Sequence, residues 1–299
     1  MTSNNHHAIE TLDLSKRYKK HLAVDELTLQ VPSGSVFAFL GRNGAGKTTT
    51  IRMLLNLLAK TSGSARVLGL DPATDTIQIK KRIGYVAEAQ KMYDWMTVDQ
   101  ITWFCKGFYP TWDDDHAESL KSKLDLPGDR KLRALSRGMQ AKVALLLAMA
   151  HRPELLILDE PTAGLDVTVR RAFLESTIGM IAEQGSTVFY STHLVHEVER
   201  IADRVAVIEN GRLIECTTIQ ALKDRIKRVV LSFDSPPPDI SLPNTLAAEK
   251  RGRQELIAVD NFSDETIARA KAASPASIEV QDMSLEEIFV ALVGSPEVA

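Results

Sequence analysis

The chain has 299 residues, 44% hydrophobic and 25% charged, a composition that excludes a fibrous or disordered protein and fits one large domain or two smaller ones. Its 36 Lys and Arg residues and 39 Asp and Glu residues leave a net charge of -3, which disfavours nucleic acid as a partner. Cys105 and Cys216 lie far apart with no CxxC or Cys/His cluster, so we expect two buried thiols in a reducing compartment and neither a zinc site nor a disulfide scaffold.

The first predicted elements are short strands. Residues 12–14 and 27–31 resemble edge strands, whereas residues 35–40 form a nearly continuous apolar run that ends in a glycine-rich turn. Such a run is typical of a buried parallel strand that leads into a helix. The polar N-terminus, residues 1–10, lacks the hydrophobic core of a signal peptide, and the longest apolar run, residues 143–150, is too short to cross a bilayer. These features predict a cytoplasmic protein.

Three more apolar runs follow at residues 155–158, 187–190 and 204–208, separated by stretches with helical periodicity. This alternation predicts an α/β domain with a parallel sheet over roughly the first 225 residues.

The composition changes after residue 225. The prolines at 236–238 can continue neither a strand ladder nor a helix. Ser284 and Glu287 form a capping-box pattern at the start of a last helix. The elements predicted here are strands at 229–233, 255–259 and 277–280 and helices at 264–273 and 285–293. They indicate a small accessory α+β domain over residues 226–299.

Residues 41–49 satisfy the phosphate-loop pattern GxxxxGK[ST] between a predicted strand and a predicted helix. Without side chains at Gly44 and Gly46 the backbone can curl around phosphate, and the helix N-terminus attracts the same oxygens. Lys47 would reach the β and γ phosphates, Thr48 would offer its hydroxyl to Mg²⁺, and Thr49 can bond another phosphate. The nucleotide-binding residues expected here are Gly41, Arg42, Asn43, Gly44, Ala45, Gly46, Lys47, Thr48 and Thr49. Alone, this loop indicates a purine nucleotide and leaves kinases and GTPases open.

Residues 155–160 place two adjacent carboxylates at the carboxyl end of a predicted strand, where open α/β sheets bind ligands. Asp159 would hold the Mg²⁺ shell, and Glu160 would orient or deprotonate the attacking water. A solvated loop start would explain Asp-Glu-Pro by itself, but not its combination with the phosphate loop.

Residues 135–139 read Leu-Ser-Arg-Gly-Met and precede a long apolar helix. They resemble the LSGGQ signature of ATP-binding cassette (ABC) ATPases: Ser136 and Gly138 match, and Arg137 and Met139 depart from the commonest form. A serine and a glycine at a helix N-terminus make an anion site. In this family that site faces the γ phosphate held by a second subunit.

The resemblance covers about residues 8–225. It implies a P-loop NTPase fold in which a RecA-like parallel sheet core carries an antiparallel β edge and a helical subdomain at about residues 88–150. The ABC nucleotide-binding domain would then occupy residues 1–225 and the accessory domain residues 226–299.

The same resemblance implies roles for single residues. Tyr18 would stack on adenine, and Val24 would pack beside the sugar. Asp166, in the D-loop at residues 163–166, would lie at a dimer interface, and His193 would be the switch histidine that contacts the γ phosphate.

Where the family usually has a Q-loop glutamine, this chain has Glu88, with Gln90 two residues on. A glutamate can ligate Mg²⁺ or water but adds negative charge beside a polyanion. Glu88 as a metal ligand and Gln90 as its substitute therefore stay open. Relatives with this glutamate belong to the antibiotic-resistance and self-protection exporters.

Seven aromatics between Tyr93 and Trp112 predict the core of the helical subdomain. In the family this region also forms a groove for a coupling helix of the membrane subunit, and we expect Trp95 or Trp103 to line it.

The resemblance as a whole implies an ATP-binding and ATP-hydrolysing subunit of an ABC membrane transporter, with ATP and Mg²⁺ as ligands. Residues 108–113 and 284–289 resemble those of the ABC-2 type exporters. The partners would be a second ABC ATPase subunit, identical or related, and transmembrane permease subunits that hold the chain at the cytoplasmic face of the cell membrane.

Other kinds of ABC protein are the alternatives to a transporter subunit. A DNA-repair ABC ATPase needs a long coiled-coil insertion between Lys47 and Ser136, but only 89 positions separate them. A translation-factor relative carries two cassettes in one chain, whereas this sequence contains one. An ATP-binding regulatory or non-transport ABC protein stays open because of Glu88 and Met139.

Overall fold

The computed structural model describes residues 7–89, 91–182 and 185–294. Gln90, the alternative to Glu88, lies outside the described residues. The chain divides into two compact units, residues 1–216 and 217–299. Within the described ranges, no helix is both long and apolar enough to cross a membrane.

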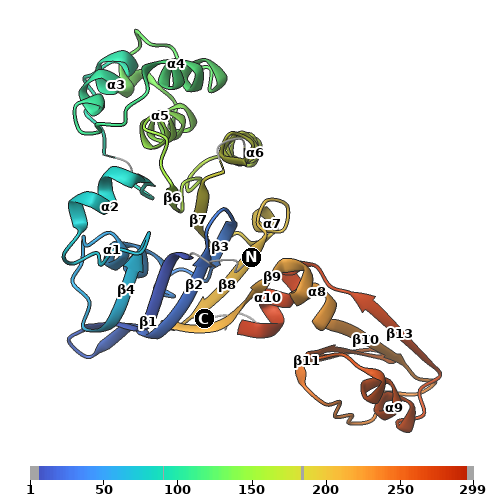
Figure 1. Ribbon diagram of the computed structural model, residues 1–299. Coiled ribbons are helices and arrows are strands. Elements are labelled where there is room, and N and C mark those ends of the chain that lie inside the picture. Colours follow the sequence, from blue (N-terminus) through green and yellow to red (C-terminus); the bar gives the residue numbers. More distant parts are fainter. Residues whose placement is uncertain (1–6, 90, 183–184, 295–299) are drawn as a thin grey trace, which may run out of the picture. The chain divides into compact units, whose positions relative to one another are not determined.

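The first unit contains a six-stranded sheet with the order β5-β6-β7-β3-β8-β9 (Figure 1). The pairs β5·β6, β6·β7, β7·β3 and β3·β8 are all parallel. The strands are β3 (Val36–Leu40), β5 (Ile83–Val86), β6 (Leu155–Asp159), β7 (Thr187–Thr192), β8 (Arg204–Glu209) and β9 (Arg212–Thr218). Because β6, β7 and β3 are neighbours, the segments that follow these three strands meet at one edge of the sheet.

A second, antiparallel sheet has the order β2-β1-β4. Its strands are β1 (His7–Tyr18), β2 (His21–Pro32) and β4 (Ser62–Val67). The prediction of an edge strand at residues 12–14 is wrong, because β1 is the middle strand. Strand β4 is largely polar and has no alternating apolar pattern. The sequence therefore did not predict it as the second hydrogen-bonded neighbour of β1.

The helices of the first unit lie around these sheets (Figure 1). They are α1 (Lys47–Leu54), α2 (Thr76–Arg82), α3 (Val98–Lys106), α4 (Asp114–Lys123), the 3₁₀ helix η1 (Leu132–Ala134), α5 (Arg137–Met149), α6 (Val167–Ala182) and α7 (Val195–Val198). Helix α1 packs against β6 and against β2 and β4, so it lies between the two sheets. Helices α3, α4 and α5 gather at one end of the unit.

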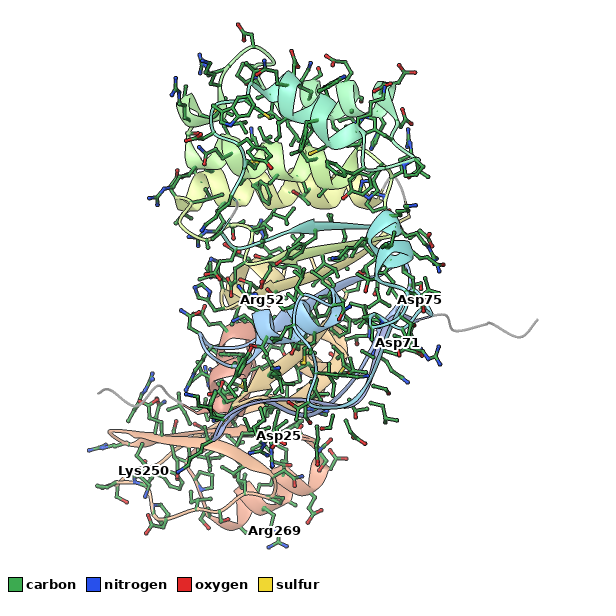
Figure 2. The ribbon with its side chains drawn as sticks, turned by 90° about the vertical axis from the view of Figure 1, so that its left-hand side faces the viewer. Asp25, Arg52, Asp71, Asp75, Lys250 and Arg269 are labelled. Atoms are coloured by element: carbon green, nitrogen blue, oxygen red, sulfur yellow. The ribbon has the colours of Figure 1, made fainter. Side chains whose placement is uncertain are left out.

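Side-chain caps fix where several helices begin. Thr97 and Gln100 form a capping box at α3, and Asp113 accepts the His116 amide at α4. In the turn before α2, Asp71 Oδ1 accepts the Ala73 amide at 2.8 Å, and Asp75 is the N-cap residue; both aspartates are labelled in Figure 2.

The core of the first unit is aliphatic and aromatic. Phe189 contacts Phe37 and Phe39 at ring-centroid distances of 5.9 and 5.3 Å, and all three are fully buried. The aromatics between Tyr93 and Trp112 behave differently from the prediction. Trp103 is 78% exposed, and Tyr93, Trp95 and Phe108 are also exposed, so most of this group is not core. The two cysteines are free and half-buried rather than buried.

Over its described residues, 217–294, the second unit has an antiparallel sheet with the order β11-β12-β10-β13 and three helices. Its elements are α8 (Ile219–Arg225), β10 (Lys227–Ser232), β11 (Thr245–Arg251), β12 (Gln254–Val259), α9 (Asp264–Ala272), β13 (Ser277–Asp282) and α10 (Leu285–Val293). Strand β11 was not predicted, since its residues are mostly exposed. The capping box of Ser284 and Glu287 is confirmed.

Candidate nucleotide site

The loop between β3 and α1 is held by contacts that only glycine permits. A Cβ on Gly41 would lie 2.5 Å from the Ile208 carbonyl oxygen, and one on Gly46 would lie 2.6 Å from the Ala23 carbonyl oxygen. Gly46 also has a φ of +111°, which side-chain-bearing residues rarely adopt. The loop therefore packs tightly against β2 and β8, and α1 begins directly after it at Lys47.

The Lys47 side chain is 5% exposed and folds into this loop. Its Nζ donates to the carbonyl oxygens of Gly41 and Arg42 at 2.8 and 3.2 Å. It also lies 3.1 Å from Glu160 Oε1. A buried ammonium group is thus fixed at the centre of the loop, where it can bind an anion.

Asp159 connects the end of β6 to two hydroxyl groups. Its Oδ1 accepts hydrogen bonds from Thr48 at 3.0 Å and from Ser191 at 2.8 Å. Burial raises the pKa of the Asp159 carboxyl, and the negative charges of Glu88 and Glu160 add to that effect. A cation beside this carboxylate would offset the cost of its charge.

Glu160 follows in a strained, left-handed backbone conformation, with φ +46°. Its amide is within hydrogen-bond distance of the Ser191 carbonyl and hydroxyl oxygens, at 3.1 and 3.2 Å. Its carboxylate is buried, with Lys47 on one oxygen and His193 Nδ1 at 2.9 Å from the other. The Glu160 carboxylate, just after β6, therefore contacts Lys47 at the start of α1 and His193 just after β7.

Lys47, Thr48 and Glu160 open into a cavity of about 380 Å³, whereas Asp159 and His193 are not among its lining residues. The lining residues are Tyr18, His21, Ala23, Asn43, Gly44, Gly46, Lys47, Thr48, Thr49, Glu88 and Glu160. Tyr18 is 45% exposed and lines the cavity from the end of β1, and Lys16 Nζ lies 5.1 Å from its ring centroid. Val24 is fully buried in the core and does not line the cavity; its neighbour Ala23 does.

Besides Ala23, sequence reasoning missed two residues in or beside this site. His21 pairs with Tyr18 across the β1–β2 hairpin and lines the same cavity. Ser191 joins Asp159 to the Glu160 amide. The signal for Ser191 was its position just before Thr192 and His193, at the carboxyl end of β7. The carboxyl ends of β6 and β7 lie at the same edge of the parallel sheet, so Ser191 comes close to Asp159.

The other predicted residues lie away from the cavity. Exposed Ser136 is the N-cap of α5, and its hydroxyl accepts the Met139 amide at 3.2 Å. Gly138 is buried, and a Cβ there would lie 2.7 Å from Val169 Cγ1 on α6. Asp166 is exposed, and its Oδ1 accepts the Val169 amide at 3.0 Å. These residues form a second surface where the starts of α5 and α6 touch.

The donor set fits a divalent cation that also binds phosphate. Thr48 and Asp159 offer hydroxyl and carboxylate oxygens 3.0 Å apart, which are the hard oxygen ligands that Mg²⁺ prefers. Among the described residues, no group of three or more His, Cys, Asp or Glu side chains is arranged to hold a metal ion.

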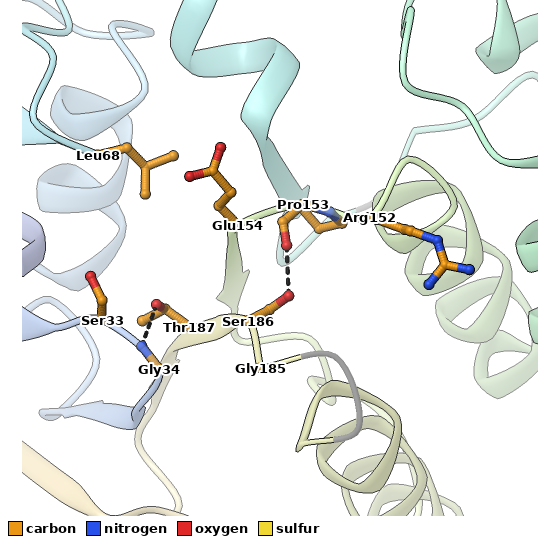
Figure 3. Close-up of a pocket in the computed structure, with 9 residues that line it drawn as sticks. All are labelled: Ser33, Gly34, Leu68, Arg152, Pro153, Glu154, Gly185, Ser186 and Thr187. Atoms are coloured by element: carbon orange, nitrogen blue, oxygen red, sulfur yellow. Dashed lines mark hydrogen bonds between the residues drawn. The ribbon is translucent and has the colours of Figure 1, made fainter.

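A larger hollow of about 520 Å³ lies at the opposite ends of the same strands (Figure 3). Gly34 donates to Thr187 Oγ1 at 2.9 Å, and Ser186 Oγ donates to the Pro153 carbonyl at 2.7 Å. Open α/β sheets bind ligands at the carboxyl ends of their strands. The smaller cavity around Lys47 is therefore the candidate site.

Comparison with known proteins shows which family the chain resembles. Residues 24–163 match the family model described as "ABC transporter". The chain is 34% identical over 222 residues to the bacitracin transport ATP-binding protein BcrA of Bacillus licheniformis, covering 74% of this chain and 72% of that protein. It is 32% identical to the daunorubicin/doxorubicin resistance ATP-binding protein DrrA of Streptomyces peucetius, covering 97% and 93%. A solved ATP-binding subunit of an ABC transporter is similar with a TM-score of 0.65 and 25% identity, over 73% of this chain and 92% of that one.

Proposed function

Because this chain belongs to the ABC transporter family as an ATP-binding subunit that hydrolyses ATP, we propose that the cavity around Lys47 is where it binds ATP and cleaves the γ phosphate. The observation that carries the proposal is the convergence of buried Lys47 and exposed His193 on the two oxygens of the buried Glu160 carboxylate. BcrA and DrrA are named for bacitracin transport and for daunorubicin/doxorubicin resistance, which supports an exporter.

Binding follows from the loop geometry. The amides of residues 41–49 and the start of α1 attract the phosphates, and Lys47 turns from Glu160 toward the β and γ oxygens. Tyr18 stacks on the base at the open end of the cavity, beside His21. Thr48 and Asp159 would hold Mg²⁺, which would neutralise phosphate charge. Glu88 lines the cavity and would be a further ligand to the metal or to its water.

Hydrolysis needs a positioned water and a proton acceptor. Glu160 takes that role because its carboxylate faces the cavity and is buried from bulk water. His193 Nδ1 lies 2.9 Å from Glu160 Oε2, so the imidazole fixes the carboxylate and can contact the γ phosphate. The protein thus contributes positioning and charge rather than a covalent intermediate.

The test is Glu160→Gln, which keeps the shape and removes the base. We expect ATP turnover to fall by about 10²–10⁴-fold while nucleotide still binds. The matched control is Glu154→Gln at the other end of β6, where the carboxylate is exposed and paired with Arg82. If the Glu160→Gln variant turned over ATP at the wild-type rate, Glu160 would not be the base.

We also propose that the surface formed by Ser136, Gly138 and Asp166 meets the nucleotide of a second ABC ATPase subunit. Ser136 is exposed at the N-terminus of the 13-residue helix α5, where the helix attracts an anion. The prediction is an ATP-dependent dimer, identical or mixed, that forms with Glu160→Gln and is lost with Ser136→Glu. Sedimentation in ATP measures it; a monomer under all conditions would contradict the proposal.

The membrane partner needs a docking surface, and an apolar groove of about 300 Å³ supports one for a permease helix. Leu57, Tyr85, Met92, Cys105 and Tyr109 line it, whereas Trp95 and Trp103 do not. Through this contact the chain would lie at the cytoplasmic face of the membrane.

Leu57→Glu tests the groove because Leu57 is 54% exposed and its replacement should leave the fold intact. We expect co-purification with the permease subunit to be lost. Ile77→Glu, at a 71% exposed position outside the groove, is the control. Equal co-purification of both variants would contradict docking in this groove.

A further inference from the structure

A buried carboxylate lies behind the proposed catalytic site and takes no part in it. Glu197, on α7, is 8% exposed, whereas the adjacent His196 is exposed. One of its oxygens, Oε2, accepts a hydrogen bond from the Tyr190 hydroxyl at 2.8 Å. The other, Oε1, lies 3.3 Å from Arg170 Nε on α6. We call Arg170, Glu197 and Tyr190 the Glu197 network.

The Arg170 end of the network holds the segment that follows Glu160. Arg170 Nη2 donates to the Leu165 carbonyl oxygen at 2.9 Å. Leu165 immediately precedes Asp166, and tight turns with the amides of Ala163 and Leu165 as donors connect this stretch back to Glu160 and Thr162. The guanidinium group therefore fixes where residues 163–166 lie.

The Tyr190 end of the network holds the segment that carries His193. Tyr190 is 1% exposed, and burial together with the Glu197 charge raises the pKa of its hydroxyl far above the ordinary value. The hydroxyl stays protonated and keeps donating to Glu197. Three residues later His193 leaves the strand and reaches Glu160.

From these contacts we infer that the Glu197 network is a positioning device that couples residues 163–166 to His193. The inference rests on the proposed function. One buried carboxylate joins the two segments, so a shift of Asp166 toward a second subunit changes the support of His193 beside Glu160. Arg170 touches neither nucleotide nor water in this scheme and acts through Leu165.

The chain offers a matched pair of variants for a test. Arg170→Gln breaks the ion pair and the bond to Leu165. Arg171→Gln, at the next position, removes an arginine that is 60% exposed and paired with Glu175 one turn on, so it serves as the control. We expect kcat for ATP to fall at least tenfold in Arg170→Gln, with nucleotide Kd within twofold of wild type and an unchanged far-UV spectrum.

A second experiment measures the coupling between Arg170 and Asp166 in kcat, which a merely structural role of Arg170 would leave at zero. If Arg170 acts by placing residues 163–166, combining Arg170→Gln with Asp166→Ala gives the kcat of the slower single variant. Independent effects on kcat would multiply, and that result would overturn the inference. So would an Arg170→Gln variant with wild-type kcat, or one whose kcat loss is matched by an equal loss of nucleotide binding.

The outcomes also separate this inference from the function it rests on. If the wild-type protein, with its membrane partner present, hydrolysed no ATP, both would fall. If Glu160→Gln abolished turnover but Arg170→Gln and Arg171→Gln both left it unchanged, the proposed function would stand and only the coupling role of the Glu197 network would be refuted.

Discussion

Gly46→Ala is the substitution that tests most directly how the phosphate loop is held. Gly46 is the N-cap of α1 with φ +111° and ψ 0°, and a methyl group there would lie 2.6 Å from the Ala23 carbonyl oxygen. Two penalties follow. The backbone conformation is unfavourable for alanine, and the added carbon contacts a backbone atom of β2 that has little room to move.

The magnitude follows from separating these penalties. The left-handed backbone costs about 1–2 kcal/mol for a residue with a Cβ, and overpacking costs about 1–3 kcal/mol. Gly34→Ala supplies the first cost alone, since Gly34 has φ +76° and no atom within 4 Å of its added methyl group. The two variants should therefore differ by about 1–3 kcal/mol in unfolding free energy, or roughly 2–12 °C in melting temperature for a unit of this size.

Melting temperature and nucleotide affinity are the two measurements. We expect Gly46→Ala to melt at a lower temperature than Gly34→Ala. It should also bind a fluorescent ATP analogue at least about tenfold more weakly, since a loss of about 1.4 kcal/mol in binding free energy raises Kd tenfold. If both variants melted within about 1 °C of each other and bound nucleotide equally, the Ala23 carbonyl would not fix the loop.

Three further predictions concern single side chains. Burial raises the pKa of Asp159, so Asp159→Asn should melt no lower than wild type without nucleotide yet lose the Mg²⁺-dependent stabilisation by ATP; a lower melting point would contradict the cause given for the shift. Burial lowers the pKa of His151, which means that the unfolded chain takes up the proton first and the unfolding free energy falls as pH drops below about 6.5. His151→Gln should reduce that fall in denaturant titrations, and an unchanged pH slope would refute it. Ser284→Ala should destabilise the second unit by about 1 kcal/mol, because its hydroxyl caps α10; hydrogen exchange of the α10 amides should show faster opening, and unaltered rates would exclude the cap as a stabilising contact.

The sequence predicted the central strands well because buried parallel strands are apolar on both faces. Residues 155–158, 187–190 and 204–208 lie in β6, β7 and β8. Strands with exposed or polar faces, such as β4 and β11, carry no such pattern and were missed. Strand β4 pairs with the distant β1, whereas β11 forms a hairpin with the next strand, β12. Periodicity within one segment reveals neither pairing.

Local motifs predicted the loop around Lys47 and the carboxylates after β6, since each motif is a short run with its own geometry. Contacts between distant segments were harder. Trp95 and Trp103 contribute to an apolar pattern in the sequence, but both are exposed. The apolar groove that we propose for a permease helix is lined by side chains from several elements, including Tyr85 and Tyr109. Composition identifies apolar residues, but only the packing of helices decides which of them remain at the surface.

The contact between α5 and α6 has a consequence for assembly. A Cβ on Gly138 would lie 2.7 Å from Val169 Cγ1, and one on Gly164 would lie 3.4 Å from Arg137 Nη1, so the two segments that carry Ser136 and Asp166 are in direct contact. A shift of one helix start would therefore be passed to the other, so Ser136 and Asp166 would move together in the proposed pairing. Ordering one connected surface costs less conformational entropy on association than ordering two independent segments.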